Sequence, residues 1–195
     1  MTVAGLVLAA GESRRLGRPK ALLEIDGERL VDRAVRVLHE AGCTTVYVVA
    51  GAAPLGEVHE RASGPVKVVD NPEWPTGMGS SVRRGLASVT EAAVVIMVVD
   101  TPWIGAAVVR RLIDAHTAGA TAAVATYDGA PRNPVLLARV HFADVSALAI
   151  GDVGARAFLA THPDVVTYVE CSDVADPFDI DTPEDLRRGG PGQCS

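Results

Sequence analysis

The stretch LVLAAGESRRLGRPKALLEIDG, residues 6–27, decides how the rest of the chain is interpreted. An apolar run over residues 3–10 is typical of a buried strand covered on both faces, and it breaks at Gly11. Four basic side chains then follow within seven residues: Arg14, Arg15, Arg18 and Lys20. A positively charged turn directly after a buried strand predicts an anion-binding loop at the edge of a sheet.

Apolar runs of strand length alternate with helical patterns along the whole chain. The predicted strands cover residues 3–10, 45–50, 66–69, 93–99, 120–126, 134–137 and 165–169. The predicted helices cover residues 30–41, 55–62, 80–89, 106–118, 155–161 and 182–188, and Ser80 or Ser81 is the expected N-cap of the third. This alternation predicts an α/β fold, a Rossmann-like three-layer sandwich with a mainly parallel sheet.

Length, charge and cysteine content limit the class of protein. The 195 residues suffice for one domain, expected over residues 1–188, and residues 189–195 read as a disordered tail. A formal net charge of −6 argues against broad nucleic-acid binding, which needs a basic face. No apolar stretch approaches the length of a membrane span, and the three cysteines form no C-x-x-C pair. We therefore expect a cytoplasmic protein that binds neither nucleic acid nor a membrane.

The basic loop is suited to phosphate. Gly11 and Gly17 enclose it, but the spacing fits neither a Walker A loop nor G-x-G-x-x-G. Backbone N–H groups of such a loop can turn toward an anion, Arg15 can bind phosphate oxygens in a bidentate way, and Lys20 adds a point charge. A solvated basic turn is the alternative, and the position between a buried strand and Pro19 favours phosphate.

Acidic residues follow two other apolar segments. Asp100 comes after six apolar residues, so it is expected at a strand end, because an unpaired buried carboxylate is very costly. Mg²⁺ favours one or two carboxylates together with phosphate oxygens, and Asp181 in FDIDTP is a second candidate. Asp181 could equally be a helix N-terminal residue that stabilises the dipole. Gly11, Asn71 and Asp100 each follow a predicted strand, which places all three at the same edge of a parallel sheet.

Other catalytic patterns find no support. The segment GMGSS, residues 77–81, offers small residues before a helix, which suits either ligand contact or a plain capped loop. The five histidines form no H-E-x-x-H or similar ligand set, and no serine sits in G-x-S-x-G.

Five segments, in order, resemble the MobA-like nucleotidyltransferases. LAAGESRRLGRPK is similar to the family signature L-A-A-G-x-S-x-R-x-G-x-x-K, and NPEWPTGMGSSVRRGL, VVDTP, GDVGARAFL and DIDTPEDL follow. The resemblance covers residues 3–186, is greatest for the molybdenum cofactor cytidylyltransferase branch, and implies the fold of the nucleotide-diphospho-sugar transferases.

The resemblance also implies roles for particular residues. The catalytic residues would be Arg15, Lys20 and Asp100, with Arg15 and Lys20 holding the triphosphate. Asp100 would bind Mg²⁺, with Asp181 as a second metal ligand. The remaining nucleotide-binding residues would be Leu8, Ala9, Ala10 and Gly11, through their backbone, together with Asn71, Gly79, Ser80 and Ser81.

The implied reaction is a magnesium-dependent transfer of a nucleoside monophosphate from a triphosphate, CTP favoured and GTP possible, with release of pyrophosphate. The acceptor would be a phosphorylated pterin, molybdopterin or molybdenum cofactor, and a molybdoenzyme is a possible partner. Such chemistry needs placement and charge neutralisation, and an ionised phosphate acceptor needs no general base.

Some positions depart from the cytidylyltransferase pattern. The branch carries Gly-His-Pro where this chain has Arg132-Asn133-Pro134, and Asp-Met-Pro where it has Asp100-Thr101-Pro102. The guanylyltransferase branch carries Asp-Thr-Pro, but its first loop is L-A-G-G. The first loop and GMGSS favour the cytidylyltransferase side.

Two alternatives stay open. One is a nicotinamide-dependent oxidoreductase, like the nicotine blue reductases that resemble this family. The lack of G-x-G-x-x-G, and of an acid after the second strand to bind a ribose hydroxyl, argues against it. The other is a non-catalytic protein that binds or inserts the molybdenum cofactor.

Overall fold

The computed structural model describes residues 2–13, 16–56, 58, 63–182 and 184–185. Its main strands are β1 (Val3–Leu8), β4 (Val46–Ala50), β5 (Val66–Asp70), β6 (Ala93–Val98), β7 (Ala122–Tyr127), β8 (Ala130–Ala138) and β9 (Val166–Glu170). Its α-helices are α1 (Leu30–Glu40), α2 (Met78–Ser88), α3 (Ala106–Thr117), α4 (Phe142–Leu148) and α5 (Arg156–Thr161). The shorter elements are the hairpin β2 (Glu24–Ile25) and β3 (Glu28–Arg29), and the 3-10 turns η2 (Lys20–Leu22), η3 (Trp74–Thr76), η4 (Arg139–His141) and η5 (Pro163–Val165).

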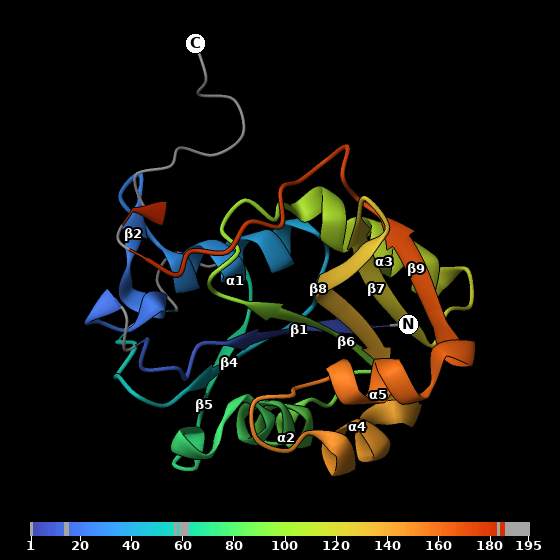
Figure 1. Cartoon of the computed structure of the whole chain (residues 1–195), viewed down its shortest axis with the longest axis horizontal. Helices are drawn as coiled ribbons and strands as arrows, with labels where there is room; N and C mark the ends of the chain where they lie inside the picture. Colours follow the sequence, from blue (N-terminus) through green and yellow to red (C-terminus); the bar gives the residue numbers. More distant parts are fainter. Residues whose placement is uncertain (1, 14–15, 57, 59–62, 183, 186–195) are drawn as a thin grey trace.

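The strands form one seven-stranded sheet in the order β5-β4-β1-β6-β8-β7-β9 (Figure 1). β1 pairs in parallel with both β4 and β6, β4 pairs in parallel with β5, and β7 pairs in parallel with β9. β8 runs antiparallel to its neighbours β6 and β7. The prediction of a mainly parallel α/β sheet is therefore confirmed.

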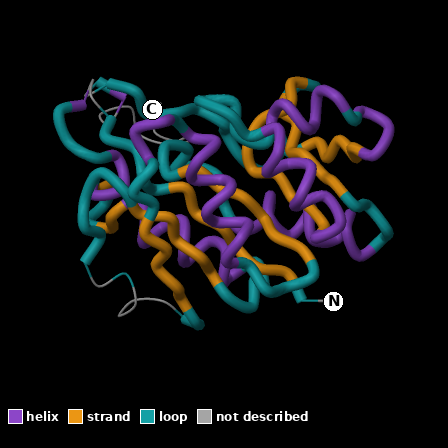
Figure 2. The backbone as a smooth tube through the Cα atoms, turned by 90° about the horizontal axis from the view of Figure 1, so that it is seen from below, coloured by secondary structure: helices purple, strands orange, loops and turns teal. Residues whose placement is uncertain are grey.

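Helices cover both faces of the sheet because successive side chains of a strand point to opposite faces. In β1, Val3 and Val7 join the core that contains α1 and α3, and Leu6 and Leu8 join the core that contains α2, α4 and α5. Figures 1 and 2 show these helix layers against the strands. A fully buried aliphatic side chain contributes about 1.5–3 kcal/mol, so the two cores hold the strand ends in fixed positions.

Several element predictions need correction. The helix predicted over residues 80–89 begins at Met78, and its N-cap is Gly77, whose φ of 112° suits glycine, instead of Ser80 or Ser81. The strand predicted over residues 134–137 is the nine-residue β8, because its prolines do not stop it from pairing with β6 and β7. α4 and the β2–β3 hairpin were not predicted.

Other predictions fall where the structure is not described. Of the helix predicted over residues 55–62, residues 55, 56 and 58 are described and form no helix. Most of the helix predicted over residues 182–188, and the whole tail at 189–195, lie outside the described residues. Within the described residues, no helix combines the length and apolar character that crossing a membrane requires.

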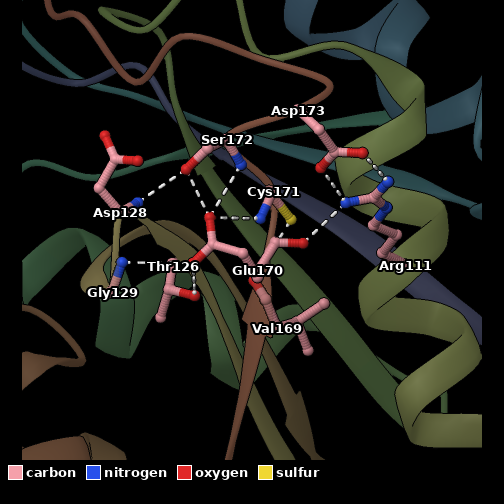
Figure 3. Close-up of polar contacts among 9 residues, drawn as sticks. All are labelled: Arg111, Thr126, Asp128, Gly129, Val169, Glu170, Cys171, Ser172 and Asp173. Atoms are coloured by element: carbon pink, nitrogen blue, oxygen red, sulfur yellow. Dashed lines mark hydrogen bonds and ion pairs between the residues drawn. The ribbon is translucent and has the colours of Figure 1, made fainter.

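Glu170 joins the end of β9 to the turn between β7 and β8 (Figure 3). Its carboxylate accepts hydrogen bonds from the hydroxyl of Thr126 (2.9 Å), the N–H of Gly129 (3.3 Å) and both the N–H and the hydroxyl of Ser172. The hydrogen bonds from Ser172, followed by those from Thr126 and Gly129, lower the pKa of Glu170 to about 2. One carboxylate thereby holds three segments together at this edge of the sheet.

Candidate active site

The loop after β1 forms one wall of the site. Ala9 stays beside β4 because its N–H donates to the carbonyl oxygen of Val49 (3.0 Å). The chain then turns at Ser13, which has a φ of 56°, and the hydroxyl of Ser13 accepts the N–H of Lys20 (3.0 Å). These contacts bring Lys20 back to the carboxyl ends of the central strands.

Lys20 meets two carboxylates that lie far away in the sequence. Its Nζ is 3.1 Å from Oδ2 of Asp100 and 2.7 Å from Oδ1 of Asp181. Asp100 follows β6, and its carbonyl oxygen accepts the N–H of Ile180 (2.8 Å), which holds Asp181 next to it. The structure therefore brings together Lys20, Asp100 and Asp181, and their roles in binding stay predictions.

The ammonium group of Lys20 is stabilised in its charged form. Burial by itself lowers the pKa, but the hydrogen bonds and charges of Asp181 and Asp100 outweigh it, so the pKa lies above the ordinary 10.5. The Lys20 side chain is 13% exposed, against 29% for Asp100 and 37% for Asp181. Lys20 is thus a cation at neutral pH, and it sits deeper than its two partners.

The two carboxylates also suit a divalent metal ion. They already share one cation, the Lys20 ammonium, so the structure shows that both can face the same positive charge. Mg²⁺ commonly uses one or two carboxylates and completes its six ligands with phosphate oxygens and waters. The described residues contain no group of three or more His, Cys, Asp or Glu side chains placed to hold a metal, so Asp100 and Asp181 would need ligands from a bound phosphate.

Asn71 organises the opposite wall. Its side-chain amide donates to the hydroxyls of Ser80 (2.9 Å) and Ser81 (3.0 Å), and its Oδ1 accepts the N–H of Glu73 (3.1 Å). Asn71 is buried, and these bonds connect the end of β5 to the first turn of α2.

The segment before α5 packs on the beginning of α2. The N–H of Gly79 donates to the carbonyl oxygen of Gly151 (2.7 Å), and the N–H of Met78 donates to Oδ1 of Asp152 (3.3 Å). A Cβ on Gly79 would lie 2.4 Å from the carbonyl oxygen of Ala149, so only glycine permits this approach. Two N–H groups at the start of α2 are therefore bound to protein atoms in this structure.

These walls enclose a cavity of about 580 Å³ outside the carboxyl ends of β1 and β6. This is the size range of small-molecule sites in proteins. One end carries the charges of Lys20, Asp100 and Asp181. The other end is lined by Trp74, Pro75 and Met78, with Asp152 at the same wall.

Most of the predicted site residues line this cavity: Leu8, Ala9, Ala10, Gly11, Lys20, Ser81, Asp100 and Asp181. Asn71, Gly79 and Ser80 lie directly behind its wall, and their contact with a nucleotide stays a prediction. Arg15 lies outside the described residues, so its role stays a prediction as well.

Sequence reasoning missed several lining residues: Ser13, Trp74, Pro75, Met78 and Asp152. The motifs NPEWPTGMGSS and GDVGARAFL contain most of them, so the motifs were found while their individual side chains were not. An aromatic residue followed by proline, between a strand end and a glycine, was the available signal for Trp74.

The arrangement suits a ligand with an anionic end and a flat end. The hydroxyl of Ser81 is bound to Asn71, and no histidine lines the cavity within the described part of the chain. The described lining therefore offers charge and shape and no activated nucleophile, which suits a reaction between phosphates.

Comparison with known sequences points to one family. A family model described as the MobA-like NTP transferase domain matches residues 5–166. The chain is 35% identical over 195 residues to nicotine blue oxidoreductase of Paenarthrobacter nicotinovorans, covering 95% of each protein. It is 32% identical over 201 residues to molybdenum cofactor guanylyltransferase of Rhodobacter capsulatus, covering 96% of this chain and 95% of that protein.

Solved structures agree with the fold. The Rv0371c homologue from Mycobacterium sp. strain JC1 superposes with a TM-score of 0.78 at 31% identity, over 95% of this chain and 93% of that one. The Rv0371c complex with manganese from Mycobacterium tuberculosis superposes with a TM-score of 0.68 at 25% identity, over 96% and 97% of the chains.

Proposed function

This chain belongs to the MobA-like NTP transferase family, and from that premise we propose that it transfers CMP from CTP to a phosphorylated pterin acceptor, with Mg²⁺ and release of pyrophosphate. The acceptor would be molybdopterin or the molybdenum cofactor. That the protein is a nucleotidyltransferase follows from the family and from the relatives together.

One observation carries the proposal: Lys20, Asp100 and Asp181 meet at one end of a cavity that the backbone after β1 also lines. An acceptor phosphate must approach the α-phosphate of the nucleotide while both carry negative charge. Lys20 and a metal ion on the two carboxylates would neutralise that charge and hold the phosphates in line. An acceptor phosphate is already ionised at neutral pH, so the absence of a histidine from the described lining is consistent with this reaction.

A divalent metal is part of the proposal. The carboxylates of Asp100 and Asp181 face a shared cation, which is the donor chemistry that Mg²⁺ takes together with phosphate oxygens. A related mycobacterial protein has been crystallised as a manganese complex, which supports testing Mn²⁺ as well as Mg²⁺.

The preference for CTP rests on the first loop, L-A-A-G at residues 8–11, and on GMGSS, which both resemble the cytidylyltransferase branch. A Cβ on Gly51 would lie 2.7 Å from Cβ of Ala10 and 2.8 Å from Cβ of Trp74, so these residues are packed closely around Gly51. Ala10 lines the cavity at the position where the L-A-G-G loop of the guanylyltransferase branch carries glycine, so its methyl group is the candidate for disfavouring the larger purine. Because one of the relatives is a guanylyltransferase, GTP is the competing nucleotide to include in any test.

Removing that methyl group tests the base preference. In Ala10→Gly we expect kcat/KM for GTP to rise about tenfold relative to CTP, the effect of one methyl group in a tight pocket. The measurement is pyrophosphate release with each nucleotide. Ala9→Gly is the matched control, because the Ala9 side chain belongs to the core on the other face of β1. An unchanged GTP-to-CTP ratio in Ala10→Gly would show that Ala10 does not set the base.

The acceptor is expected at the same edge of the sheet. β8 runs antiparallel to β6, with Val135 opposite Ile96, so Arg132 near the start of β8 lies toward the carboxyl ends of the parallel strands. Arg132 is exposed and can bind a phosphate group of the acceptor. A molybdenum cofactor transferase among the relatives supports a pterin acceptor.

The decisive experiment measures pyrophosphate from each of the four triphosphates, with Mg²⁺ or Mn²⁺ and with molybdopterin as the acceptor. We expect release with CTP above all others, dependence on the metal, and loss of at least about 100-fold in Lys20→Ala. Lys67→Ala is the control, since Lys67 lies on β5 and contacts Tyr47. Absence of release with every nucleotide, or full activity in Lys20→Ala, would contradict the proposal. Tight acceptor binding without release would instead favour a cofactor insertion protein.

A second candidate function is reduction of a pigment by a nicotinamide cofactor. The observation that favours it is the 35% identity to nicotine blue oxidoreductase along nearly the whole chain. Hydride transfer needs no metal between Asp100 and Asp181, so the two functions separate on metal dependence. We expect CTP with Mg²⁺ to raise the melting temperature and NADPH to leave it unchanged. The reverse pattern, with NADPH consumption in the presence of nicotine blue, would establish the oxidoreductase.

A further inference from the structure

Lys20 occupies the place that the proposed function gives to a metal ion. Its Nζ lies between the carboxylates, 3.1 Å from Asp100 and 2.7 Å from Asp181, and its side chain is 13% exposed. Without nucleotide, the carboxylate pair therefore already has a counter-cation supplied by the chain itself.

This arrangement hinders each ligand when it arrives alone. A divalent cation that approaches the two carboxylates meets the Lys20 ammonium, which carries the same sign of charge. A triphosphate that approaches Lys20 meets an ammonium group that is already paired with Asp100 and Asp181, and the negative charge of these carboxylates repels phosphate. When both arrive together, the metal can take the carboxylates while the phosphates take the ammonium, and every charge keeps an opposite partner.

We propose that Lys20 and the divalent cation exchange places on Asp100 and Asp181, so that metal and triphosphate bind to this protein as an interdependent pair. The inference rests on the proposed function, because it assigns two successive roles to one residue of the same site. Lys20 is the counter-cation of the carboxylates before nucleotide binds, and a phosphate ligand afterwards. By linkage, each ligand then raises the affinity for the other by the same factor.

The backbone allows this exchange without a change of fold. The N–H of Lys20 donates to the hydroxyl of Ser13 (3.0 Å), and its carbonyl oxygen accepts the N–H of Leu23 (3.0 Å). Both bonds stay in place when only the side chain turns. Ser13 and Gly11 line the same cavity as Lys20, so a small rotation carries the ammonium from the carboxylates toward the loop that is expected to hold phosphate.

The first test measures Mn²⁺ binding to the nucleotide-free protein. The electron paramagnetic resonance signal of the unbound ion gives the amount of Mn²⁺ that is not bound. Lys20→Met removes the competing charge and keeps the length of the side chain, so we expect Mn²⁺ to bind about tenfold more tightly than to wild type, an ordinary size for coupling between sites. The chain contains only one other lysine, Lys67, which makes Lys67→Met a matched control with the same change in net charge. Adding Asp100→Asn to Lys20→Met should abolish the gain.

A second test needs no variant and so does not depend on the folding of Lys20→Met. With two lysines in the chain, lysine-specific isotope labelling gives one side-chain NMR signal for each. We expect the Lys20 signal to move when Mg²⁺ and the α,β-methylene analogue of CTP are added together. Mg²⁺ alone should move it only at much higher concentration, and the Lys67 signal should stay in place throughout.

The outcomes separate this inference from the proposed function. If Lys20→Met binds Mn²⁺ no more tightly than wild type, or if the Lys20 signal does not respond while Mg²⁺ and the analogue bind, the exchange is wrong although nucleotidyl transfer can stand. If wild type binds no nucleotide with any metal, the proposed function fails. A tenfold gain in Lys20→Met would still show that Lys20 competes with a cation on these carboxylates.

Discussion

Asn71 is buried, and its side chain has a structural role that its sequence motif did not reveal. Its amide donates to the hydroxyls of Ser80 and Ser81, and its Oδ1 accepts the N–H of Glu73. All three partners belong to the wall that also carries Trp74. The position of that wall therefore depends on one amide with a relative exposure of 3%.

Replacing this amide should cost stability first. In Asn71→Ala, we expect the free energy of unfolding to fall by about 1–3 kcal/mol, because the hydroxyls of Ser80 and Ser81 and the N–H of Glu73 each lose their hydrogen bond with Asn71. The Ser80 hydroxyl keeps its bonds to the carbonyl oxygens of Glu73 and Gly77. Denaturant unfolding measures the loss, and Ser88→Ala at the exposed end of α2 is the control. If Asn71→Ala were as stable as wild type but lost nucleotide affinity, Asn71 would contact the nucleotide directly.

Glu170 should make the stability of the protein depend on pH in the acid range. Hydrogen bonds from Ser172 above all hold its pKa at about 2, below the ordinary 4.5. A carboxylate with a lowered pKa contributes stability that is complete above 4.5 and is lost as pH falls through the folded value of about 2. Glu170→Gln should therefore lower the melting temperature most at pH 6–7, and the difference from wild type should shrink at pH 3.

Melting curves of both proteins at pH 7, 4.5 and 3 measure this difference. Glu40→Gln on α1, which removes the carboxylate that pairs with Arg36, is the control for the substitution itself. A gap between wild type and Glu170→Gln that stays constant down to pH 3 would mean that Glu170 does not hold the β9 end as a carboxylate.

The beginning of α2 shows why an element boundary is hard to place from sequence. Ser80 and Ser81 are good N-cap residues, and they precede an amphipathic pattern. In the structure, the chain enters the helix two residues earlier, through Gly77, and the serine hydroxyls bond to Asn71 instead. The N-cap preference of serine identified the correct turn of the helix. It did not identify the first residue, because the Ser80 hydroxyl accepts a hydrogen bond from Asn71, nine residues upstream.

Two glycines of α2 allow a direct comparison of close contacts. A Cβ on Gly79 would lie 2.4 Å from a backbone oxygen, that of Ala149, whereas a Cβ on Gly85 would lie 2.6 Å from the tip of the Leu6 side chain. Gly79→Ala must displace backbone, so we expect a loss of about 1–3 kcal/mol in unfolding free energy and reduced activity as Asp152 moves. Gly85→Ala should lose stability and keep its activity per folded molecule.

Denaturant unfolding and pyrophosphate release on both variants measure the two effects. Equal activity in Gly79→Ala and Gly85→Ala would show that the contact between α2 and the segment around Gly151 does not position the site.

Long apolar runs carried most of the fold prediction. The runs that became β1, β4 and β6 are buried on both faces, and their short length and many valines indicated strands. α4 is seven residues long and β2 only two, so neither gave a periodic signal strong enough to predict. β8 extends beyond the predicted residues 134–137 at both ends, because β6 and β7 pair with it on its two sides.

The order of the strands explains where the cavity lies. From β1 the chain passes through α1 to β4 on one side, and from β5 it returns through α2 on the other face to β6 on the opposite side of β1. Helices on opposite faces leave a crevice at the carboxyl ends of β1 and β6, which is the usual ligand site in such sheets. The sequence could predict this edge because the carboxyl ends of parallel strands lie at the same edge of a sheet, although it did not predict the order of the strands.

The charged end of the site was predictable, and the flat end was not. Asp100 and Asp181 each follow apolar residues, where a charge needs a structural reason, and Lys20 closes a basic cluster directly after a buried strand. Trp74 in η3 and Met78 at the start of α2 are apolar residues that gave no periodic signal, and only the structure shows that they line a cavity.

Asp100 and Asp181 share Lys20 as their partner. We therefore expect substitutions of the two carboxylates to combine in one way in their effect on stability and in another way in their effect on activity. Asp100→Asn or Asp181→Asn alone leaves Lys20 one carboxylate, and we expect each to cost less than about 1 kcal/mol in unfolding free energy, as for partly exposed ion pairs. The double variant leaves the lysine ammonium without either carboxylate, so its cost in unfolding free energy should exceed the sum of the two single variants.

Activity should show the opposite pattern. Each single variant should lose about 100-fold or more in kcat, and the double variant should be little worse, because residues that act as a unit are lost together.

Denaturant unfolding and pyrophosphate release on the two single variants and the double variant measure both patterns. Asp173→Asn, which breaks the exposed pair with Arg111 far from the cavity, is the control for the substitution itself. Simple additivity in both measurements would mean that Lys20, Asp100 and Asp181 act independently, and that the meeting of their charges at the sheet edge has no functional consequence.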